Sequence, residues 1–294
     1  MRSMLFVPGD SARKFESALC TAADSLIIDL EDSVAQGRKA QARQDTLEML
    51  RAPQPHAKVL FVRVNALDSG MALADLAAIM PGRPYGVVLP KCQSADDVKK
   101  LSLYLDAFEA VSGAPNGSTR ILAIATETAQ SLFGLGTYTA AGPRLWGLMW
   151  GAEDLSASLG ASTNRKEGRW LDPYLMARSL CLAGAAAAGV AVIDTVETDI
   201  GDLDRVRLAS VDARRDGFSG KAVIHPKHVD VVNETFSLTE EERAWAQRVV
   251  AAFAADPDAG VVRLGDMMID KPHLRAAQRM LGIHAAAGSE VRRQ

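Results

Sequence analysis

Eight short, apolar, β-rich runs recur along the chain and alternate with longer segments of helical character. The runs span residues 3–7, 25–30, 59–64, 86–90, 121–126, 145–150, 190–194 and 221–225. Each is nearly continuous in apolar residues, which is typical of parallel strands with helices outside and packed side chains inside. Eight such units favour a closed (β/α)8 TIM barrel over an open doubly wound sheet. The absence of a Gly-rich nucleotide fingerprint after the first run supports this choice.

The pattern changes towards the C-terminus. Thr239 and Glu242 have the spacing of a capping box at the start of a helix, and a second helix is expected over residues 272–282. These elements lie outside the eight βα units. We therefore predict a catalytic barrel over residues 1–235 and a C-terminal helical appendage over residues 236–294 that acts as a lid or an oligomer contact.

Composition excludes several classes of protein. A chain of 294 residues that is 48% hydrophobic can bury one large core. Its formal net charge of -3 and scattered basic residues offer no stripe for nucleic acid, and no run approaches the ~20 apolar residues of a membrane span. The first run is too short for a signal peptide. Three distant cysteines, Cys20, Cys92 and Cys181, suggest buried free thiols. We expect a cytoplasmic protein without nucleic-acid or membrane partners.

Polar side chains follow the predicted strands at their C-terminal ends, which form the working face of such a barrel. They are Asp29, Glu31, Asp32, Arg63, Asn65, Lys91, Glu127, Glu153, Asp154, Asp194 and His225. Glu127 and Asp154 lie one βα unit apart, so both carboxylates are expected at the barrel mouth on neighbouring strands. Two oxygen ligands, with water and substrate in the other positions, suit Mg²⁺. A salt bridge to a barrel arginine or a helix cap would explain either carboxylate equally well.

Three basic residues at this face each admit two interpretations. Arg63 lies in an apolar strand and needs an anionic partner, either Asp29 or Glu31 in the same barrel or the carboxylate of a substrate. Lys91 could form the Schiff base of a class I aldolase, but a lysine at a strand end is more often a charge partner. His225 has no nucleophile nearby in the sequence, which favours a hydrogen-bonded structural role.

At these residues the chain resembles the β-subunit of citrate lyase and its relatives, the malyl-CoA and citramalyl-CoA lyases. The matching motifs are RSMLFVPG, DLEDSV, VRVN, LPK, ATETA, GAEDL, KAVIHP and IDKPHLRAAQRML. They span nearly the whole chain in the family's order, and the ordered series is more specific than any single motif. One departure is Thr126 before Glu127, where the family commonly has I-E-T.

The resemblance implies a Mg²⁺-dependent carbon-carbon lyase. The expected substrate is a 3-hydroxyacyl thioester, cleaved to an acyl thioester and a small 2-oxo acid or formed in the reverse direction. Glu127 and Asp154 match the metal ligands, with Glu127 also lining the substrate site, and Arg63 matches the residue that binds the substrate carboxylate. Asp270 matches an acid that the family's C-terminal segment delivers to a neighbouring subunit, where it protonates the carbanion.

The same resemblance implies roles for further residues and partners. The acidic residues Asp29, Glu31 and Asp32 match a group that transfers protons or holds the barrel rim. Arg13 and Lys14 could meet the phosphates of coenzyme A or an acyl carrier protein, although an exposed helix face also explains them. A homo-oligomer, trimer or hexamer, is expected. The segment 161–170 matches a variable loop, so the choice of substrate stays open.

Two rival functions remain on the sequence alone. The first is a metal-dependent aldolase that acts on free 2-oxo acids without a thioester. The second is a non-catalytic barrel retained as a carrier-protein-binding or assembly subunit. Activity against thioesters compared with free acids separates these possibilities.

Overall fold

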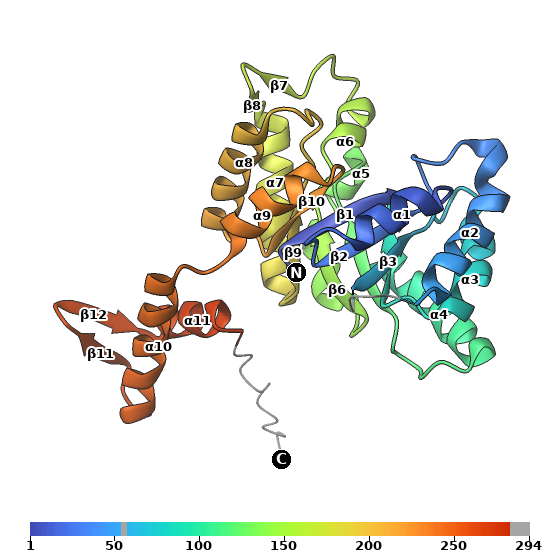
Figure 1. Cartoon of the computed structure of the whole chain (residues 1–294). Coiled ribbons are helices and arrows are strands. Elements are labelled where there is room, and N and C mark those ends of the chain that lie inside the picture. The colour runs from blue at the N-terminus through green and yellow to red at the C-terminus, as the bar shows by residue number, and fades with distance from the viewer. Residues whose placement is uncertain (54–57, 283–294) are drawn as a thin grey trace. The chain divides into compact units, whose positions relative to one another are not determined.

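A closed barrel of eight parallel strands forms the centre of the larger part of the chain in a computed structural model, which describes residues 1–53 and 58–282 (Figure 1). The strands are β1 (Ser3–Pro8), β2 (Ser25–Asp29), β3 (Val59–Arg63), β4 (Gly86–Leu89), β5 (Arg120–Ile124), β6 (Leu145–Met149), β9 (Ala191–Asp194) and β10 (Gly220–Val223). β1 pairs with both β2 and β10, which closes the barrel. The predicted TIM barrel and its eight strands are confirmed.

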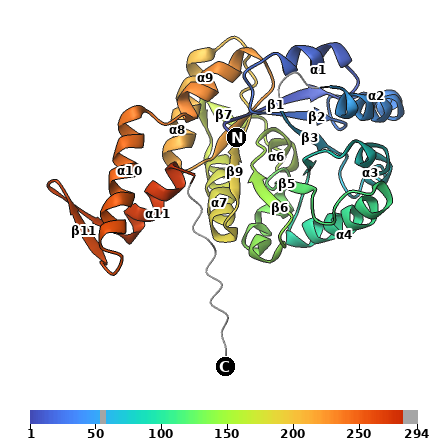
Figure 2. The same ribbon diagram turned by 60° about the horizontal axis from the view of Figure 1, so that its bottom comes forward.

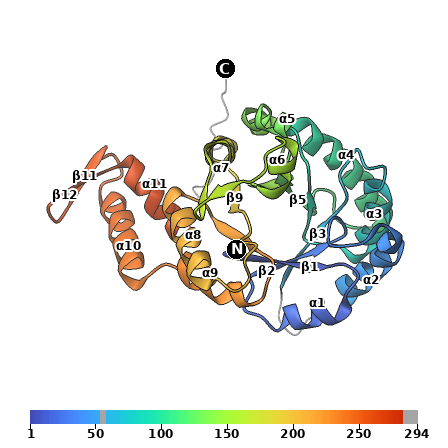
Figure 3. The same cartoon turned by 90° about the horizontal axis from the view of Figure 1, so that it is seen from above.

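Helices surround the strands, as seen from above in Figure 3. They are α1 (Ala12–Leu19), α2 (Lys39–Arg51), α3 (Ala72–Ile79), α4 (Ala95–Ser112), α5 (Ala129–Leu132), α6 (Glu153–Ser158), α7 (Asp172–Ala188), α8 (Leu203–Asp216) and α9 (Lys227–Phe236). A short hairpin of β7 (Arg165–Lys166) and β8 (Arg169–Trp170) interrupts the series and was not predicted. It lies in the insert that was expected to vary.

Two buried layers explain why the strand sequences are continuously apolar. Ile27 and Phe61 belong to a cluster made of strand and strand-end residues, which fills the barrel interior. Their neighbours Leu26, Ile28 and Val62 belong to a larger cluster that includes residues of the surrounding helices. Successive side chains on one strand point to opposite faces, so both faces must be apolar when both are covered.

A buried ion pair lies near the N-terminal ends of β5 and β6, away from the predicted site. Glu109 of α4 is fully buried and accepts hydrogen bonds from Arg144, at 2.8 Å and 2.6 Å, and from the backbone N–H groups of Gly117 and Thr119. Burial alone raises the pKa of Glu109, but these donors outweigh it and hold the pKa at about 2.

The substitution Glu109→Gln is expected to lower the free energy of unfolding at neutral pH by about 3 kcal/mol, which corresponds to this pKa shift. The carboxylate of the unfolded chain titrates near its ordinary value. The stabilisation is therefore complete above that value and is lost as the pH falls towards about 2. Denaturant unfolding measured at a series of pH values should show that the free energy of unfolding falls less steeply with acid in the variant than in the wild type. The kcat at neutral pH should be unchanged. An unchanged pH profile would contradict the assignment.

The second compact unit begins at Ser237. It consists of α10 (Glu240–Ala255), the hairpin β11 (Val261–Leu264) and β12 (Met267–Asp270), and α11 (Lys271–Met280), all visible in Figure 2. The predicted capping box of Thr239 and Glu242 is present at α10. The sequence missed the hairpin, whose Ile269 packs on Phe253 and Ala277 in a small core. Residues 283–294 of the predicted appendage lie outside the described residues.

Two smaller expectations can be checked against the described residues. No helix within residues 1–53 and 58–282 has the length and apolar content needed to cross a bilayer. All three cysteines are free, and Cys92 and Cys181 are buried as predicted. Cys20 is exposed, so the expectation of a buried thiol was wrong there. It follows α1 directly, as the C-cap residue of that helix.

Candidate active site

A cavity of about 430 Å³ opens at the C-terminal ends of the strands. Its wall includes the predicted site residues Asp29, Asp32, Arg63, Glu127 and Asp154. These five come from four separate regions of the chain, at or after β2, β3, β5 and β6, and the barrel brings them together because parallel strands end on one face.

Arg63 is held by acidic neighbours from β2 and the loop that follows it. Asp29 and Arg63 are register partners on adjacent strands, and the guanidinium makes a two-pronged contact with Asp29, with Nε–Oδ1 and Nη2–Oδ2 distances of 2.7 Å. Its Nη1 lies 2.9 Å from Glu31 Oε2. The structural interpretation of Arg63 is therefore correct. Its side chain is still 12% exposed and lines the cavity, so a role towards substrate is compatible with it.

Asp29 makes several hydrogen bonds that hold the end of β2 and the loop that follows it. Besides Arg63, its carboxylate accepts backbone N–H bonds from Glu31 at 2.9 Å and Ser33 at 3.1 Å. Burial raises the pKa of Asp29, but Arg63 and these donors lower it further, so the net pKa lies below the ordinary value. A carboxylate engaged in this way holds the rim and is poorly suited to transfer protons.

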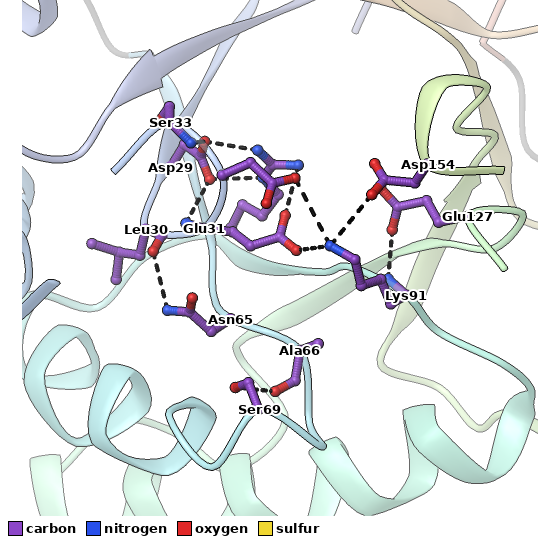
Figure 4. Close-up of polar contacts among 12 residues, drawn as sticks. Asp29, Leu30, Glu31, Ser33, Asn65, Ala66, Ser69, Lys91, Glu127 and Asp154 are labelled. Carbon is purple, nitrogen blue, oxygen red and sulfur yellow. Dashed lines mark hydrogen bonds and ion pairs between the residues drawn. The ribbon is translucent and has the colours of Figure 1, made fainter. Parts of the chain in front are cut away.

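Lys91, in the loop after β4, connects the acidic residues of the site (Figure 4). Its ammonium donates to Glu31 Oε1 and lies 3.6 Å from Asp154 Oδ1 and 3.8 Å from Asp32 Oδ2. Burial lowers the pKa of Lys91, but Glu31 and the other carboxylates raise it above the ordinary value. A firmly protonated amine is a poor Schiff-base nucleophile. The structure thus favours the charge-partner interpretation of Lys91.

Glu127 follows β5 and is only 4% exposed. Its Oε2 accepts the backbone N–H of Lys91 at 2.5 Å. Burial, with the nearby charges of Asp154 and Glu31, raises the pKa of Glu127 to about 8 despite this hydrogen bond. At Gly151 an added Cβ would lie 2.8 Å from Glu127 Cγ, so a side chain there would crowd the carboxylate.

Asp154 lies in the first turn of α6 and is 36% exposed. No side-chain cap is formed at the N-cap of α6, and the ion pair found for Asp154 is with Lys91. The helix-cap alternative is therefore wrong. The loops that carry Glu127 and Asp154 are joined by Thr126, whose hydroxyl accepts from Gly151 N at 2.9 Å and lies 3.2 Å from Gly151 O. The departure at Thr126 thus supplies a link between these two loops.

Glu127 and Asp154 suit a divalent cation. Burial and, to a smaller extent, the like charges of Asp154 and Glu31 raise the pKa of Glu127, and a Mg²⁺ ion would supply the positive charge that favours its ionised form. Among the described residues, no group of three or more His, Cys, Asp or Glu side chains has metal-binding geometry. Two protein carboxylates with open positions for water and substrate are characteristic of Mg²⁺ sites.

Sequence reasoning missed Lys39 as a residue that shapes the site. Its buried ammonium donates to Leu30 O at 2.7 Å, Glu31 O at 2.6 Å and Asn65 Oδ1 at 2.9 Å. These bonds fix the backbone that presents Glu31. A lysine at the start of a helix is normally expected to be exposed, so the sequence contained no indication of this role.

Arg13 and Lys14 are exposed on α1 and line a second cavity of about 540 Å³. The two cavities share the lining residues Phe6, Val7, Pro8 and Ile224. The acidic cavity and the cavity beside Arg13 and Lys14 therefore share part of their walls.

Two predicted positions lie outside the acidic cavity, and a third belongs to the second unit. Asp194 pairs with the buried Lys221 at 2.6 Å and accepts from Trp150 Nε1 at 2.6 Å, outside the cavity. His225 Nδ1 accepts the backbone N–H of Lys227, in agreement with a structural role. Asp270 belongs to the second unit, where its carboxylate caps α11.

An eight-stranded barrel with paired carboxylates and an arginine at its mouth defines a class of metal-dependent carbon-carbon lyases and aldolases. The chain belongs to the HpcH/HpaI aldolase/citrate lyase family, whose model matches residues 2–226. A model for carbon-carbon bond lyases of the TIM-barrel fold matches residues 206–287.

Known relatives share most of the chain's length. Citrate lyase subunit beta of Escherichia coli K12 is 36% identical over 282 residues, covering 95% of this chain and 92% of that protein. Mitochondrial citramalyl-CoA lyase of Mus musculus is 31% identical, covering 95% and 85%. Among solved structures, protein CitE of Mycobacterium tuberculosis in complex with magnesium, acetoacetate and coenzyme A is 33% identical, with a TM-score of 0.75 and coverage of 96% and 97%.

Proposed function

We propose that this protein is a Mg²⁺-dependent lyase that cleaves a 3-hydroxyacyl thioester of the malyl, citramalyl or citryl type into an acyl thioester and a 2-oxo acid, or runs the reverse condensation. The observation that carries the proposal is that Glu127 and Asp154 are brought together beside Arg63 at one cavity. The family relatives that act on citrate or on coenzyme A thioesters support it.

Glu127 and Asp154 are the proposed metal ligands, and a Mg²⁺ ion held there would polarise an oxygen of the substrate as a Lewis acid. Arg63, held by Asp29 and Glu31, still lines the cavity, and we assign its charge to the attraction of a substrate carboxylate. Asp32 lines the cavity with its side chain 59% exposed, so we assign it the removal of the substrate's hydroxyl proton.

Cleavage of the carbon-carbon bond moves the bonding electrons onto the thioester as an enolate, and the hydroxyl carbon becomes the carbonyl of the 2-oxo acid. An acid must then protonate the enolate carbon. We assign this step to Asp270 of a neighbouring copy, delivered by the second unit acting as a lid or oligomer contact. The proposal thus includes a homo-oligomer, a trimer or hexamer, in the cytoplasm.

The recess beside α1 suits the carrier of the thioester. Arg13 and Lys14 line it, and two basic side chains match the phosphates of coenzyme A or of an acyl carrier protein's prosthetic group. The two cavities share part of their walls, and we propose that the acyl end of such a carrier extends from one to the other and reaches Glu127 and Asp154.

Purified protein with Mg²⁺ is expected to release a 2-oxo acid from at least one of the malyl-, citramalyl-, hydroxymethylglutaryl- and citryl-thioesters. The double variant Arg13→Ala, Lys14→Ala should raise KM for the coenzyme A thioester roughly tenfold with kcat unchanged, because charge-assisted contacts to phosphate are lost. The double variant Lys99→Ala, Lys100→Ala on the exposed face of α4 is the matched control. Equal turnover of free acids would favour the aldolase rival, and Mg²⁺ binding without turnover of any thioester would favour the non-catalytic one.

A further inference from the structure

Lys91 has an unusual backbone conformation for a residue with a side chain. Its φ is 52°, in the left-handed region, which it shares among non-glycine residues of the described part only with Arg83 and Glu167. A side chain makes the left-handed backbone conformation unfavourable, so a non-glycine residue keeps it only where surrounding contacts hold it. Such residues are found most often at functional sites. Of the three, Lys91 is the one that contacts the proposed metal ligands.

Both ends of Lys91 contact this pair of carboxylates. The backbone N–H donates to Glu127 Oε2 at 2.5 Å, while the ammonium lies 3.6 Å from Asp154 Oδ1. Glu31 holds the same ammonium from the other side, and Glu31 is itself fixed by Arg63 at 2.9 Å. One residue therefore links the two ligands that come from separate loops.

We propose that Lys91 is a positioning residue that sets the metal affinity of the site, its backbone N–H orienting Glu127 and its ammonium sharing Asp154 with the metal. This inference rests on the proposed function. The ammonium of Lys91 is a compact charge on a flexible side chain, and it also pairs with Glu31 and Asp32. It can therefore keep these partners when a metal ion takes Asp154. The divalent ion needs Asp154 directly, so the two cations compete for one carboxylate.

The two roles predict opposite effects of removing the ammonium. Without Mg²⁺, Glu31, Asp32 and Asp154 lose their shared counter-ion and repel one another, so the fold is destabilised. With Mg²⁺, the repulsion between ammonium and metal is gone, so the ion binds more tightly. A lysine with a merely structural role would lose the same stability in both conditions.

The variant Lys91→Met tests this with calorimetric Mg²⁺ titration and thermal unfolding of the full chain. We expect the Kd for Mg²⁺ to fall about tenfold, and the loss of Tm to be larger in chelator than in saturating Mg²⁺. Lys91→Arg should restore the metal-independent Tm. Lys99→Met, which removes an exposed ammonium paired with Asp96, is the matched control and should change neither quantity.

Several outcomes would overturn the inference. A Kd for Lys91→Met equal to or weaker than wild type, or equal Tm losses in chelator and in Mg²⁺, would show that the ammonium does not compete with the metal. If the Met variant does not fold, Lys91→Gln, which keeps a donor beside Glu31, provides the same comparison. Failure of the wild-type protein to bind Mg²⁺ would instead reject the proposed function, and this inference with it.

Discussion

Replacing Glu127 with Gln or Asp154 with Asn is expected to lower Mg²⁺-dependent kcat by roughly three orders of magnitude, about 4 kcal/mol of transition-state stabilisation. Each substitution is isosteric and removes one of the two proposed protein ligands. The fold should persist. The side-chain oxygen of the introduced Gln could still accept the hydrogen bond from the Lys91 backbone N–H. Burial already raises the pKa of Glu127 to about 8, so the site tolerates a neutral side chain.

The measurement combines turnover, by release of the 2-oxo acid, with Mg²⁺ titration and thermal unfolding. Both variants should lose metal binding while keeping a Tm close to wild type in chelator. Glu153→Gln is the matched control for loss of a carboxylate and should keep metal binding, because Glu153 lines the same cavity but bonds Asn164 and is not a proposed ligand. Full turnover of both variants in the presence of chelator would show that the metal assignment is wrong.

Arg63→Ala is expected to destabilise the protein by about 3 to 5 kcal/mol, in addition to weakening substrate binding. The structure places Arg63 between Asp29 and Glu31, both almost fully buried, so its removal leaves two carboxylates without their main counter-charge. For a barrel of this size, roughly 2 to 4 °C per kcal/mol gives a fall in Tm of about 6 to 20 °C. KM should rise as well, because the guanidinium lines the cavity.

A double-mutant cycle separates the two effects. Asp29→Asn added to Arg63→Ala removes one unpaired charge and should recover part of the lost stability, while substrate binding stays weak. Arg63→Lys keeps the charge but loses the two-pronged geometry, and should fall between the wild type and Arg63→Ala. A wild-type Tm for Arg63→Ala, measured with KM and kcat in parallel, would contradict the structural half of this assignment.

The fold could be predicted from the sequence because the same pattern, an apolar strand followed by a helix, recurs eight times in the barrel. The sequence left the partner of Arg63 open between Asp29, Glu31 and a substrate carboxylate, whereas the register of β2 with β3 pairs Arg63 directly with Asp29. The spacing of Glu127 and Asp154 correctly placed both at the mouth of the barrel. What spacing could not show was that Lys91 lies between them, because side-chain direction in a loop depends on the local backbone and on charges from other strands.

Several residues were beyond the reach of sequence. The burial of Lys39 is compensated by three oxygens from the segments that follow β2 and β3. Asp194 ends a strand as the site residues do, yet it faces the helical layer and Lys221. The β11–β12 hairpin was missed because its strands are four residues each and half exposed, which leaves a weak apolar pattern.

Sequence by itself determined the barrel and the face at which its polar residues gather, and it supplied the carboxylates that we propose as metal ligands, because periodicity and strand order are local properties repeated along the chain. Tertiary structure alone decided which charges meet: Arg63 with Asp29 and Glu31, and Lys91 with Glu31 and Asp154. Those contacts join loops far apart in the chain. Their energies depend on distance and burial, which are set only when the barrel closes.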